Sequence, residues 1–305
     1  MTSTLRELSA AQLARELPGG LKLRIGPFVV SMVGCDRLLA DCLQAHYPDY
    51  PLAPPDSFPD ARLHLGEQGW LARLLGRPRE ICLEDEIRFT DFPPEALLAH
   101  IEWSMNWCIA TRANQFLMLH GGVVARDEGA LIMPGVPGAG KSTLSAYLMH
   151  RGWRLFSDEF TLLTPGTLEL KPFPRLIPLK NESIEVIKAV VPEAEFGPQI
   201  PGTRKGRVSH LKPTGEHLRR MHEGAQPRLV VFPRYQAGAA TELAAMPKSA
   251  CFAELTQNAF NYVLLGQQAF EMVADLTDRV QSYRLVYSDL TEANQALQDA
   301  LRAAA

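Results

Sequence analysis

The chain has 305 residues, of which 46% are apolar and 21% are charged. At roughly 150 residues per domain, this length predicts about two domains, and the composition excludes a disordered or collagen-like chain. The net charge is −3, from 31 basic and 34 acidic side chains, so the sequence lacks the basic excess of a nucleic-acid-binding protein. No apolar run reaches the ~18 residues of a membrane span. The N-terminus lacks a signal-peptide pattern, so we expect a cytoplasmic location.

The cysteines predict no structural site. They stand at positions 35, 42, 82, 108 and 251, an odd number without a C-x-x-C pair, and the histidines are scattered too. We therefore expect reduced, mostly buried thiols and no zinc centre.

Residues 1–115 predict a small α+β region for recognition or assembly, without a chemical motif. Thr4 and Glu7 have the spacing of a capping box. In chain order we expect a helix after Thr4, strands within 21–33, a helix at 37–45, strands at 61–65 and 80–89, and a long helix after Pro93. Trp103 and Trp107 on that last helix are interpreted as core residues.

From residue 116 to 305 the pattern is α/β. We expect strands at 116–119 and 123–125, interrupted by Gly121-Gly122, then a strand at 130–133, a glycine-rich loop, a helix at 141–150 and strands near 153–156 and 160–163. Helices are expected at 182–190, 269–280 and 291–301, and strands at 228–232 and 283–287. The order strand, loop, helix, strand is typical of a nucleotide-binding unit.

The glycine-rich loop matches G-x-x-x-x-G-K-[ST] at every fixed position. Its predicted nucleotide-binding residues are Gly135, Val136, Pro137, Gly138, Ala139, Gly140, Lys141, Ser142 and Thr143. The glycines let backbone N–H groups turn toward a phosphate, and the following helix presents its positive N-terminus to the same anion. Lys141 supplies a charge for the β- and γ-phosphates of ATP, and the Ser142 hydroxyl is a ligand for Mg²⁺. The alternative is a glycine-rich turn with a coincidental lysine.

Two adjacent carboxylates, Asp158 and Glu159, follow the predicted helix, on or beside a strand. Beside phosphates, one can hold Mg²⁺ while the other accepts a proton from an attacking hydroxyl. The alternative is a solvated strand end. Neither the guanine-reading [NT]-K-x-D motif nor the protein-kinase signatures are found, which disfavours a Ras-like GTPase and excludes a eukaryotic-type protein kinase.

The run from His120 through the P-loop to Arg151-Gly-Trp-Arg-Leu-Phe-Ser-Asp158-Glu159 resembles the catalytic domain of bacterial HPr kinase/phosphorylase. That resemblance implies an α/β P-loop core like that of phosphoenolpyruvate carboxykinase. It also implies that Asp158 is the general base, that Glu159 and Ser142 lie at the metal, and that His120 lies beside the transferred phosphate. Without the resemblance, His120 is an ordinary strand histidine.

A narrower resemblance covers nearly the whole chain. Segments 23–28, 102–107, 179–184, 203–211 and 232–235 are similar to motifs of the HPr kinase-related proteins called HprK-related kinase A. This resemblance implies a kinase but leaves its phosphoacceptor open. HPr kinases assemble as oligomers, so the resemblance also implies a possible homo-oligomer.

Several basic residues are candidates to neutralise phosphate charge, namely Arg175, Lys180, Lys205, Arg207 and Arg234. Arg175 and Lys180 are preferred because prolines restrain their segment; for each residue, a solvated surface charge is the alternative. The leading hypothesis is thus an ATP- and Mg²⁺-dependent kinase acting on a hydroxyl of a protein, peptide or small molecule. Two alternatives stay open: a metabolite kinase or phosphorylase of the same fold, and a nucleotide-binding regulatory module.

Overall fold

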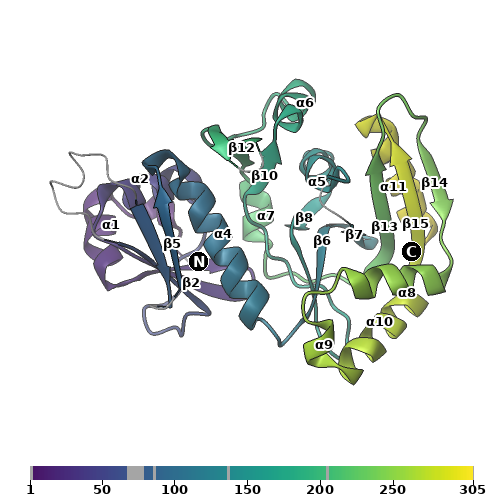
Figure 1. Ribbon diagram of the computed structural model, residues 1–305, viewed down its shortest axis with the longest axis horizontal. Helices are drawn as coiled ribbons and strands as arrows, with labels where there is room; N and C mark the ends of the chain where they lie inside the picture. The colour runs from purple at the N-terminus through teal and green to yellow at the C-terminus, as the bar shows by residue number, and fades with distance from the viewer. Residues whose placement is uncertain (1–2, 67–78, 85–86, 136–137, 204–205, 305) are drawn as a thin grey trace. The chain divides into compact units, whose positions relative to one another are not determined.

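The computed structural model describes residues 3–66, 79–84, 87–135, 138–203 and 206–304, and it is mixed α/β with mixed sheets (Figure 1). The chain divides into two compact units. The first contains Met1–Arg112 and Gly197–Arg207, and the second contains Ala113–Phe196 and Val208–Ala305. No sequence pattern predicts that Gly197–Arg207, which interrupts the second unit in the chain, belongs to the first unit. Within the described ranges, every helix is too short or too polar to cross a membrane.

The first unit contains a sheet in the order β1-β2-β3-β4-β5, in which β2 and β3 are parallel and the other pairs antiparallel. The capping box of Thr4 and Glu7 is confirmed. The described elements of this unit are η1 (Leu5–Glu7), α1 (Ala10–Glu16), η2 (Leu17–Gly19), β1 (Leu21–Ile25), β2 (Phe28–Val33), α2 (Arg37–His46), β3 (Ala61–Leu65), β4 (Arg79–Leu83), β5 (Ile87–Phe92), η3 (Pro94–Ala96), α4 (Leu97–Arg112) and β11 (Ile200–Thr203).

Strand alternation gives this sheet one apolar and one polar face. On β1, Leu21, Leu23 and Ile25 are buried, whereas Lys22 and Arg24 between them are only half-buried. The apolar face packs against helices, since α4 contacts β3 and β4 and itself contacts α2. The opposite face carries the polar side chains Lys22, Arg24, Ser31 and Arg62 together with Val29 and Val33 of β2, because successive residues of a strand point to opposite sides.

Two expectations for side-chain burial were wrong. Trp107 is 47% exposed on α4, while Glu102 on the same helix is buried and accepts a hydrogen bond from the Tyr47 hydroxyl at 2.5 Å. A buried position of α4 is therefore occupied by a polar residue, Glu102, which is hydrogen-bonded to Tyr47. All five cysteines lie in the described residues and none of them forms a disulfide bond, but only Cys108 and Cys251 are buried.

The second unit contains the larger sheet, in the order β14-β15-β13-β7-β6-β8, with β9 also paired to β6. The described elements are β6 (Leu117–Arg126), β7 (Gly129–Pro134), α5 (Lys141–Met149), β8 (Arg154–Ser157), β9 (Phe160–Leu163), β10 (Ile177–Lys180), α6 (Glu182–Val190), β12 (Gly206–Leu211), α7 (Gly215–Arg219), β13 (Pro227–Tyr235), β14 (Glu242–Ala245), α8 (Lys248–Gln257), α9 (Tyr262–Leu265), α10 (Gln267–Arg279), β15 (Gln281–Tyr287) and α11 (Leu290–Ala303). Gly206–Leu211 spans the point where the two units meet in the chain.

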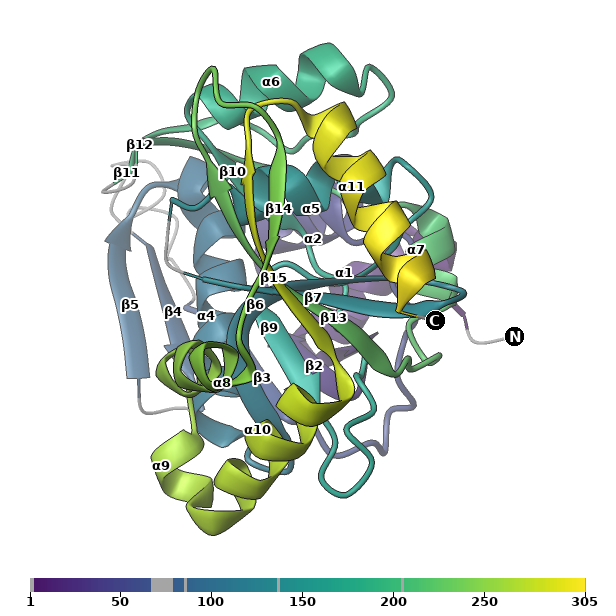
Figure 2. The same ribbon diagram turned by 90° about the vertical axis from the view of Figure 1, so that its right-hand side faces the viewer.

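The central strands of this sheet combine parallel and antiparallel pairs. β7 is parallel to β13, and β13 is parallel to β15, whereas β6 and β7 form an antiparallel hairpin. Figure 2 shows α5 and α11 on one side of these strands and α8 and α10 on the other. Each side has its own apolar core, and the strands contribute alternate residues to the two cores. The sheet is thus buried on both faces at β7 and β13, which holds the end of β7 in place.

One sequence expectation for this unit was wrong. Gly121 and Gly122 do not interrupt a strand, because β6 runs without a break from Leu117 to Arg126. Asp158 and Glu159, expected on or beside a strand, form the bend between β8 and β9. The predicted helices 182–190, 269–280 and 291–301 are confirmed as α6, α10 and α11, with small differences at the ends.

Candidate nucleotide-binding and transfer site

The predicted P-loop connects β7 to α5 in the second unit (Figure 1). Gly135, Gly138 and Gly140 have φ values of 145°, 89° and 91°, which L side chains rarely adopt. Gly140 is the N-cap of α5, and among the described residues no side chain caps this helix end. The conformation therefore requires glycine where the motif places it, and the first turn of α5 faces the loop with its backbone donors.

Close backbone packing explains the two glycines of β6. A Cβ at Gly121 would lie 2.9 Å from the carbonyl oxygen of Met133 and 3.0 Å from the Cα of Pro134. A Cβ at Gly122 would lie 2.7 Å from Oγ of Ser145 on α5. The absence of side chains here lets β6 approach both the strand that enters the P-loop and the helix that leaves it.

Two tyrosines support the loop from the C-terminal strands. The Tyr287 hydroxyl donates to the carbonyl oxygen of Gly140 at 3.2 Å, and the backbone N–H of Tyr235 donates to the carbonyl oxygen of Ala139 at 3.1 Å. Their rings meet edge to face with centroids 5.9 Å apart. Tyr287 is buried, whereas Tyr235 is 54% exposed beside the loop.

Lys141 is buried and its ammonium group donates to the carbonyl oxygen of Gly135 at the other end of the loop. Burial lowers the pKa of Lys141, the charges of Asp158 and Glu159 oppose that shift, and the charge of Lys180 adds to it. Two cations and two carboxylates therefore act on one another at the start of α5. An arriving phosphate would supply the negative charge that Lys141 faces in P-loop proteins.

Asp158 and Glu159 are presented by the bend between β8 and β9. The Ser157 hydroxyl accepts hydrogen bonds from the backbone N–H groups of Glu159 at 3.3 Å and Phe160 at 3.0 Å. The carbonyl oxygen of Glu159 accepts from Gly121 N–H at 3.1 Å. Since β6 pairs with both β8 and β9, the backbone of the bend is held from both sides.

The Asp158 carboxylate is an unusual buried group. It is 8% exposed, and both carboxylate oxygens lack a hydrogen-bond partner of good geometry in the described chain. Burial, followed by repulsion from Glu159, raises the pKa of Asp158 to about 6, against the lowering effects of the nearby Ser142 hydroxyl, Lys141 and Lys180. A carboxylate with this pKa is ionised at neutral pH and still basic enough to accept a proton.

His120 lies beside Glu159 on the neighbouring strand. Nε2 of His120 is 3.6 Å from Oε1 of Glu159, and each side chain is about a third exposed or less, at 26% and 34%. The His120 ring contacts Phe260 with centroids 5.8 Å apart, and Phe260 also contacts Phe160. Aromatic side chains thus border the pair, and the structure brings the predicted site residues His120 and Glu159 together.

The two preferred cations behave differently. Lys180, at the end of β10, is close enough to lower the pKa values of both Asp158 and Lys141. The residue after it, Asn181, has a φ of 51°, a strained conformation for a non-glycine residue. Arg175 is buried, with its guanidinium 5.0 Å from the centre of the Phe173 ring, and it is not among the charges that shift the pKa of Asp158.

The remaining predicted residues have mixed positions. Ser142 and Thr143 are half-buried on the first turn of α5. Arg234 is exposed next to Tyr235, and Arg207 belongs to the first unit. Val136, Pro137 and Lys205 lie outside the described residues.

The residues present fit a nucleotide phosphate chain with Mg²⁺. A Cβ added at Gly138 would meet no described atom within 4 Å, so the loop has space there, and the buried carboxylate oxygens of Asp158 lack a hydrogen-bond partner of good geometry among the described residues. Among the described side chains, no group of three or more His, Cys, Asp and Glu forms a ready metal cage. Mg²⁺ with nucleotides needs only one or two protein ligands, because phosphates and water supply the rest.

Sequence reasoning missed the residues that support the site without touching a phosphate. Tyr287, Phe260 and the close approach of Gly121 have no local motif. Tyr235 ends a resembling segment, yet its role behind the loop depends on the pairing of β13 with β7. In comparisons with known proteins, no family model matches this chain, and no curated protein matches it significantly.

Proposed function

We propose that the protein is an ATP-dependent phosphotransferase that transfers the γ-phosphate to a hydroxyl group. The observation that carries this proposal is Asp158, a buried carboxylate with a pKa of about 6 whose oxygens have no hydrogen-bond partner of good geometry among the described residues. Burying such a group costs folding free energy. A proton acceptor next to a phosphate-binding loop accounts for that cost.

In this proposal each residue has a separate task. The P-loop backbone and the N-terminus of α5 bind the β- and γ-phosphates, and Lys141 neutralises their charge. Asp158 accepts the proton of the acceptor hydroxyl. The hydroxyl oxygen forms the new bond to the γ-phosphorus, the bond from that phosphorus to the bridging oxygen breaks, and ADP leaves with its electron pair. Lys180 stabilises negative charge on the transferred group, and His120 lies beside Glu159 and the transferred phosphate.

Ser142 and Glu159 would hold Mg²⁺, which neutralises charge on the phosphate oxygens when bound. These two residues belong to the start of α5 and to the acidic bend, next to Lys141 and Asp158. We also propose that the second unit has the HPr kinase-like core implied by the resemblance. The order β7, loop, α5 and the acidic bend support that assignment.

A nucleotide-dependent regulatory module is the second candidate, and a metabolite kinase or phosphorylase of the same fold is a variant of the first. A pure switch requires phosphate and metal ligands but no general base. Asp158 therefore discriminates between the two classes. The proposed phosphoacceptor is a hydroxyl group of a protein, a peptide or a small molecule, and the proposal does not choose among these three.

The decisive experiment is Asp158→Asn with two measurements on the same preparation. ATP binding is titrated, and single-turnover transfer from γ-labelled ATP to the proteins and small molecules of a native lysate is followed by mass spectrometry. We expect binding within a few-fold of wild type and transfer reduced by at least about a hundredfold. Asp127→Asn, in the exposed turn between β6 and β7, is the control and should transfer normally.

Other outcomes have defined meanings. Normal transfer by Asp158→Asn removes this residue from catalysis and favours the regulatory module. Loss of ATP binding together with transfer assigns Asp158 to the metal instead of the proton. Absence of labelled product with wild type, under conditions where ATP binds, contradicts the phosphotransferase proposal.

A further inference from the structure

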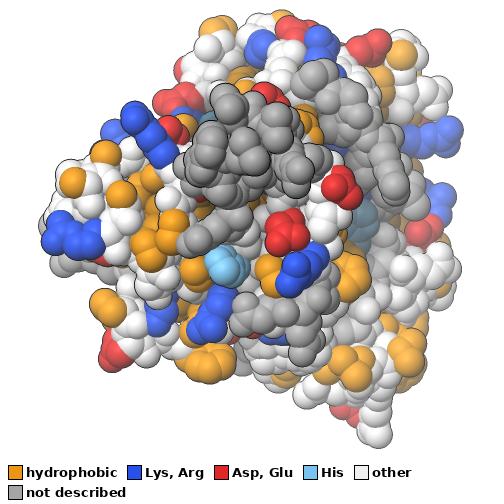
Figure 3. All heavy atoms as spheres, turned by 60° about the vertical axis from the view of Figure 1, so that its left-hand side comes forward, with side chains coloured by type: hydrophobic (Ala, Val, Ile, Leu, Met, Phe, Trp, Pro, Cys, Tyr) orange, Lys and Arg blue, Asp and Glu red, His pale blue; other side chains and the backbone are white. Residues whose placement is uncertain are grey.

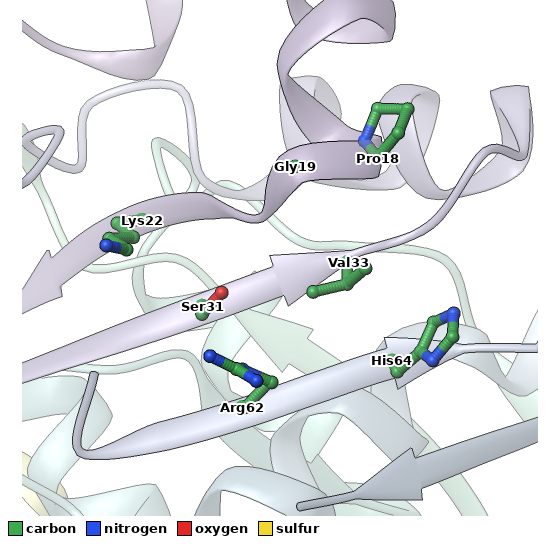
Figure 4. A pocket seen from close by; sticks show the side chains of 7 residues that line it. All are labelled: Pro18, Gly19, Lys22, Ser31, Val33, Arg62 and His64. Atoms are coloured by element: carbon green, nitrogen blue, oxygen red, sulfur yellow. The ribbon is translucent and has the colours of Figure 1, made fainter. Parts of the chain in front are cut away.

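A hollow of about 300 Å³ opens on the polar face of the sheet in the first unit (Figure 4). It lies between Pro18-Gly19, at the end of η2, and side chains of β1, β2 and β3. The polar side chains that line it are Lys22, Ser31, Arg62 and His64. Within the described part of the chain, no acidic residue lines it.

Strand register brings these side chains together. Lys22 is opposite Ser31, and Ser31 is opposite Arg62, so the three form a row across β1, β2 and β3. His64 is opposite Val33, one step further along the same face. Figure 4 shows Arg62 reaching from β3 toward Ser31, with Lys22 beyond it on β1. The row therefore presents two permanent cations, a hydroxyl and an imidazole to one hollow.

Three of the four polar side chains that line the hollow have no hydrogen-bond or ion-pair partner within the described residues. The Arg62 guanidinium, the His64 ring and the Ser31 hydroxyl make no hydrogen bond or ion pair there. The nearby Glu84 is already engaged, because its carboxylate accepts from the Arg62 backbone N–H at 2.7 Å and pairs with Arg112 at 3.1 Å. Glu84, the nearby acid that could neutralise the Arg62 guanidinium, is therefore already paired with Arg112.

The other walls keep the row open and fixed. The Lys22 ammonium donates to the carbonyl oxygens of Pro55 and Ser57, so its charge has a set position beside the row. A Cβ at Gly20 would lie 2.8 Å from the Ser31 hydroxyl oxygen, and one at Gly19 would meet no described atom within 4 Å. A side chain at Gly20 would therefore collide with the buried Ser31 hydroxyl, and the space beside Gly19 is open.

We propose that this hollow binds the phosphate group of a small molecule. A phosphate monoester carries close to two negative charges at neutral pH, which matches the two permanent cations, whereas a single carboxylate requires one. Arg62 offers a planar fork of donors to phosphate oxygens, Lys22 a point charge, and Ser31 and His64 further hydrogen bonds. On the face drawn in Figure 3, Lys and Arg side chains are dispersed among acidic and apolar ones. The binding determinant proposed for the hollow is the local row of Lys22, Ser31 and Arg62.

The test uses the full chain with Lys141→Ala, so that the P-loop lysine cannot account for phosphate binding. Inorganic phosphate, glycerol 3-phosphate and succinate are titrated separately by calorimetry. We expect a phosphate-binding site to remain, with either inorganic phosphate or the monoester bound more tightly, which identifies the source of the group. Addition of Arg62→Gln should weaken binding by at least about tenfold, because charge-assisted hydrogen bonds are lost.

Arg24→Gln is the matched control, since Arg24 lies two residues from Lys22 on the same strand and does not line the hollow. It should bind phosphate within about twofold of the parent, because Arg24 does not line the hollow and so donates no hydrogen bond to a ligand in it. In NMR spectra of the parent, the His64 ring resonances should shift on phosphate addition, which locates the ligand. No binding by the Lys141→Ala parent, equal losses with Arg62→Gln and Arg24→Gln, unmoved His64 resonances, or succinate bound as tightly as phosphate would each overturn the proposal.

Discussion

The Tyr287 hydroxyl donates to the carbonyl oxygen of Gly140, 3.2 Å away and 147 residues earlier in the chain. Gly140 is the N-cap of α5, and Tyr287 ends β15. β15 is joined through β13 to β7, the strand that enters the P-loop. The parallel strands β7, β13 and β15 therefore support the loop that follows β7. Through Tyr287, the C-terminal part of the chain contacts the candidate site at Gly140.

Tyr287→Phe should loosen the P-loop without unfolding the protein. The substitution retains the buried ring and removes only the hydroxyl that holds Gly140, a loss of about 1 kcal/mol for a neutral hydrogen bond. We expect ATP affinity to fall by about three- to tenfold, measured by titration. Tyr283→Phe is the control, because its hydroxyl contacts Gln281 on the same strand at 2.6 Å, far from the loop. An equal loss of affinity in both variants would show that the contact with Gly140 does not matter.

Lys141→Ala should abolish nucleotide binding at the concentrations that saturate wild type. Lys141 is buried next to Asp158 and Glu159, and its removal takes away a cation that offsets the charge of those carboxylates. Phosphate binding then lacks a positive charge and faces repulsion. Lys188→Ala on α6, where the side chain is 43% exposed, is the control. Unchanged ATP affinity in a folded Lys141→Ala protein would contradict the assignment of the loop.

Local patterns explain which parts of this structure could be predicted from the sequence. The loop motif places Lys141 at the start of a helix, because glycine at 135, 138 and 140 permits the positive φ values that the turn requires. The apolar stripe of α11 likewise predicts a helix with one buried face, and Ala293, Leu297 and Leu301 are buried. These features depend on residues within one or two turns of each other.

Features that depend on distant pairing could not be predicted in the same way. Arg175 and Lys180 are close in sequence, yet Lys180 lowers the pKa of Asp158, whereas Arg175 is buried with its guanidinium over the Phe173 ring. Gly121 and Gly122 suggested an interrupted strand, but they are needed for close contact with β7 and α5. Trp107 is exposed on a helix whose hydrophobic pattern suggested a core position. Each outcome is decided by which segment packs opposite, which the local sequence does not contain.

Gly121→Ala should affect the P-loop through the backbone of β7. The added Cβ would lie 2.9 Å from the Met133 carbonyl oxygen and 3.0 Å from the Pro134 Cα, so the strand leading to Gly135 must move. We expect a loss of about 1–3 kcal/mol in the free energy of unfolding and weaker ATP binding. Gly19→Ala, whose Cβ would meet no described atom within 4 Å, is the control for urea unfolding. Wild-type stability and affinity in Gly121→Ala would show that β6 and β7 have room to separate.

The rate of transfer should depend on pH through Asp158. Its pKa is raised to about 6 in the ligand-free protein, so the carboxylate is protonated below that pH and cannot accept a proton. We expect kcat/KM to fall about tenfold for each pH unit below about 6. The measurement is kcat/KM from pH 4.5 to 8 at constant ionic strength. A profile that is flat across pH 6 would contradict the role of Asp158 as the base.

The same pKa makes a second prediction, for the stability of the ligand-free protein. The folded state holds the Asp158 proton more tightly than the unfolded chain does, since the pKa rises from 3.8 to about 6 on folding. The free energy of unfolding should therefore decrease as the pH rises from about 4 to about 6, by up to roughly 3 kcal/mol from this group. Asp158→Asn removes the titration, and its stability relative to wild type should increase across that interval and then remain constant. Urea unfolding of both proteins at pH 4, 5, 6 and 7 measures this difference, with Asp127→Asn as the control for an exposed acid. If Asp158→Asn and wild type change in parallel over this range, Asp158 is not buried as a carboxylate with a raised pKa, and the proposed base loses its physical support.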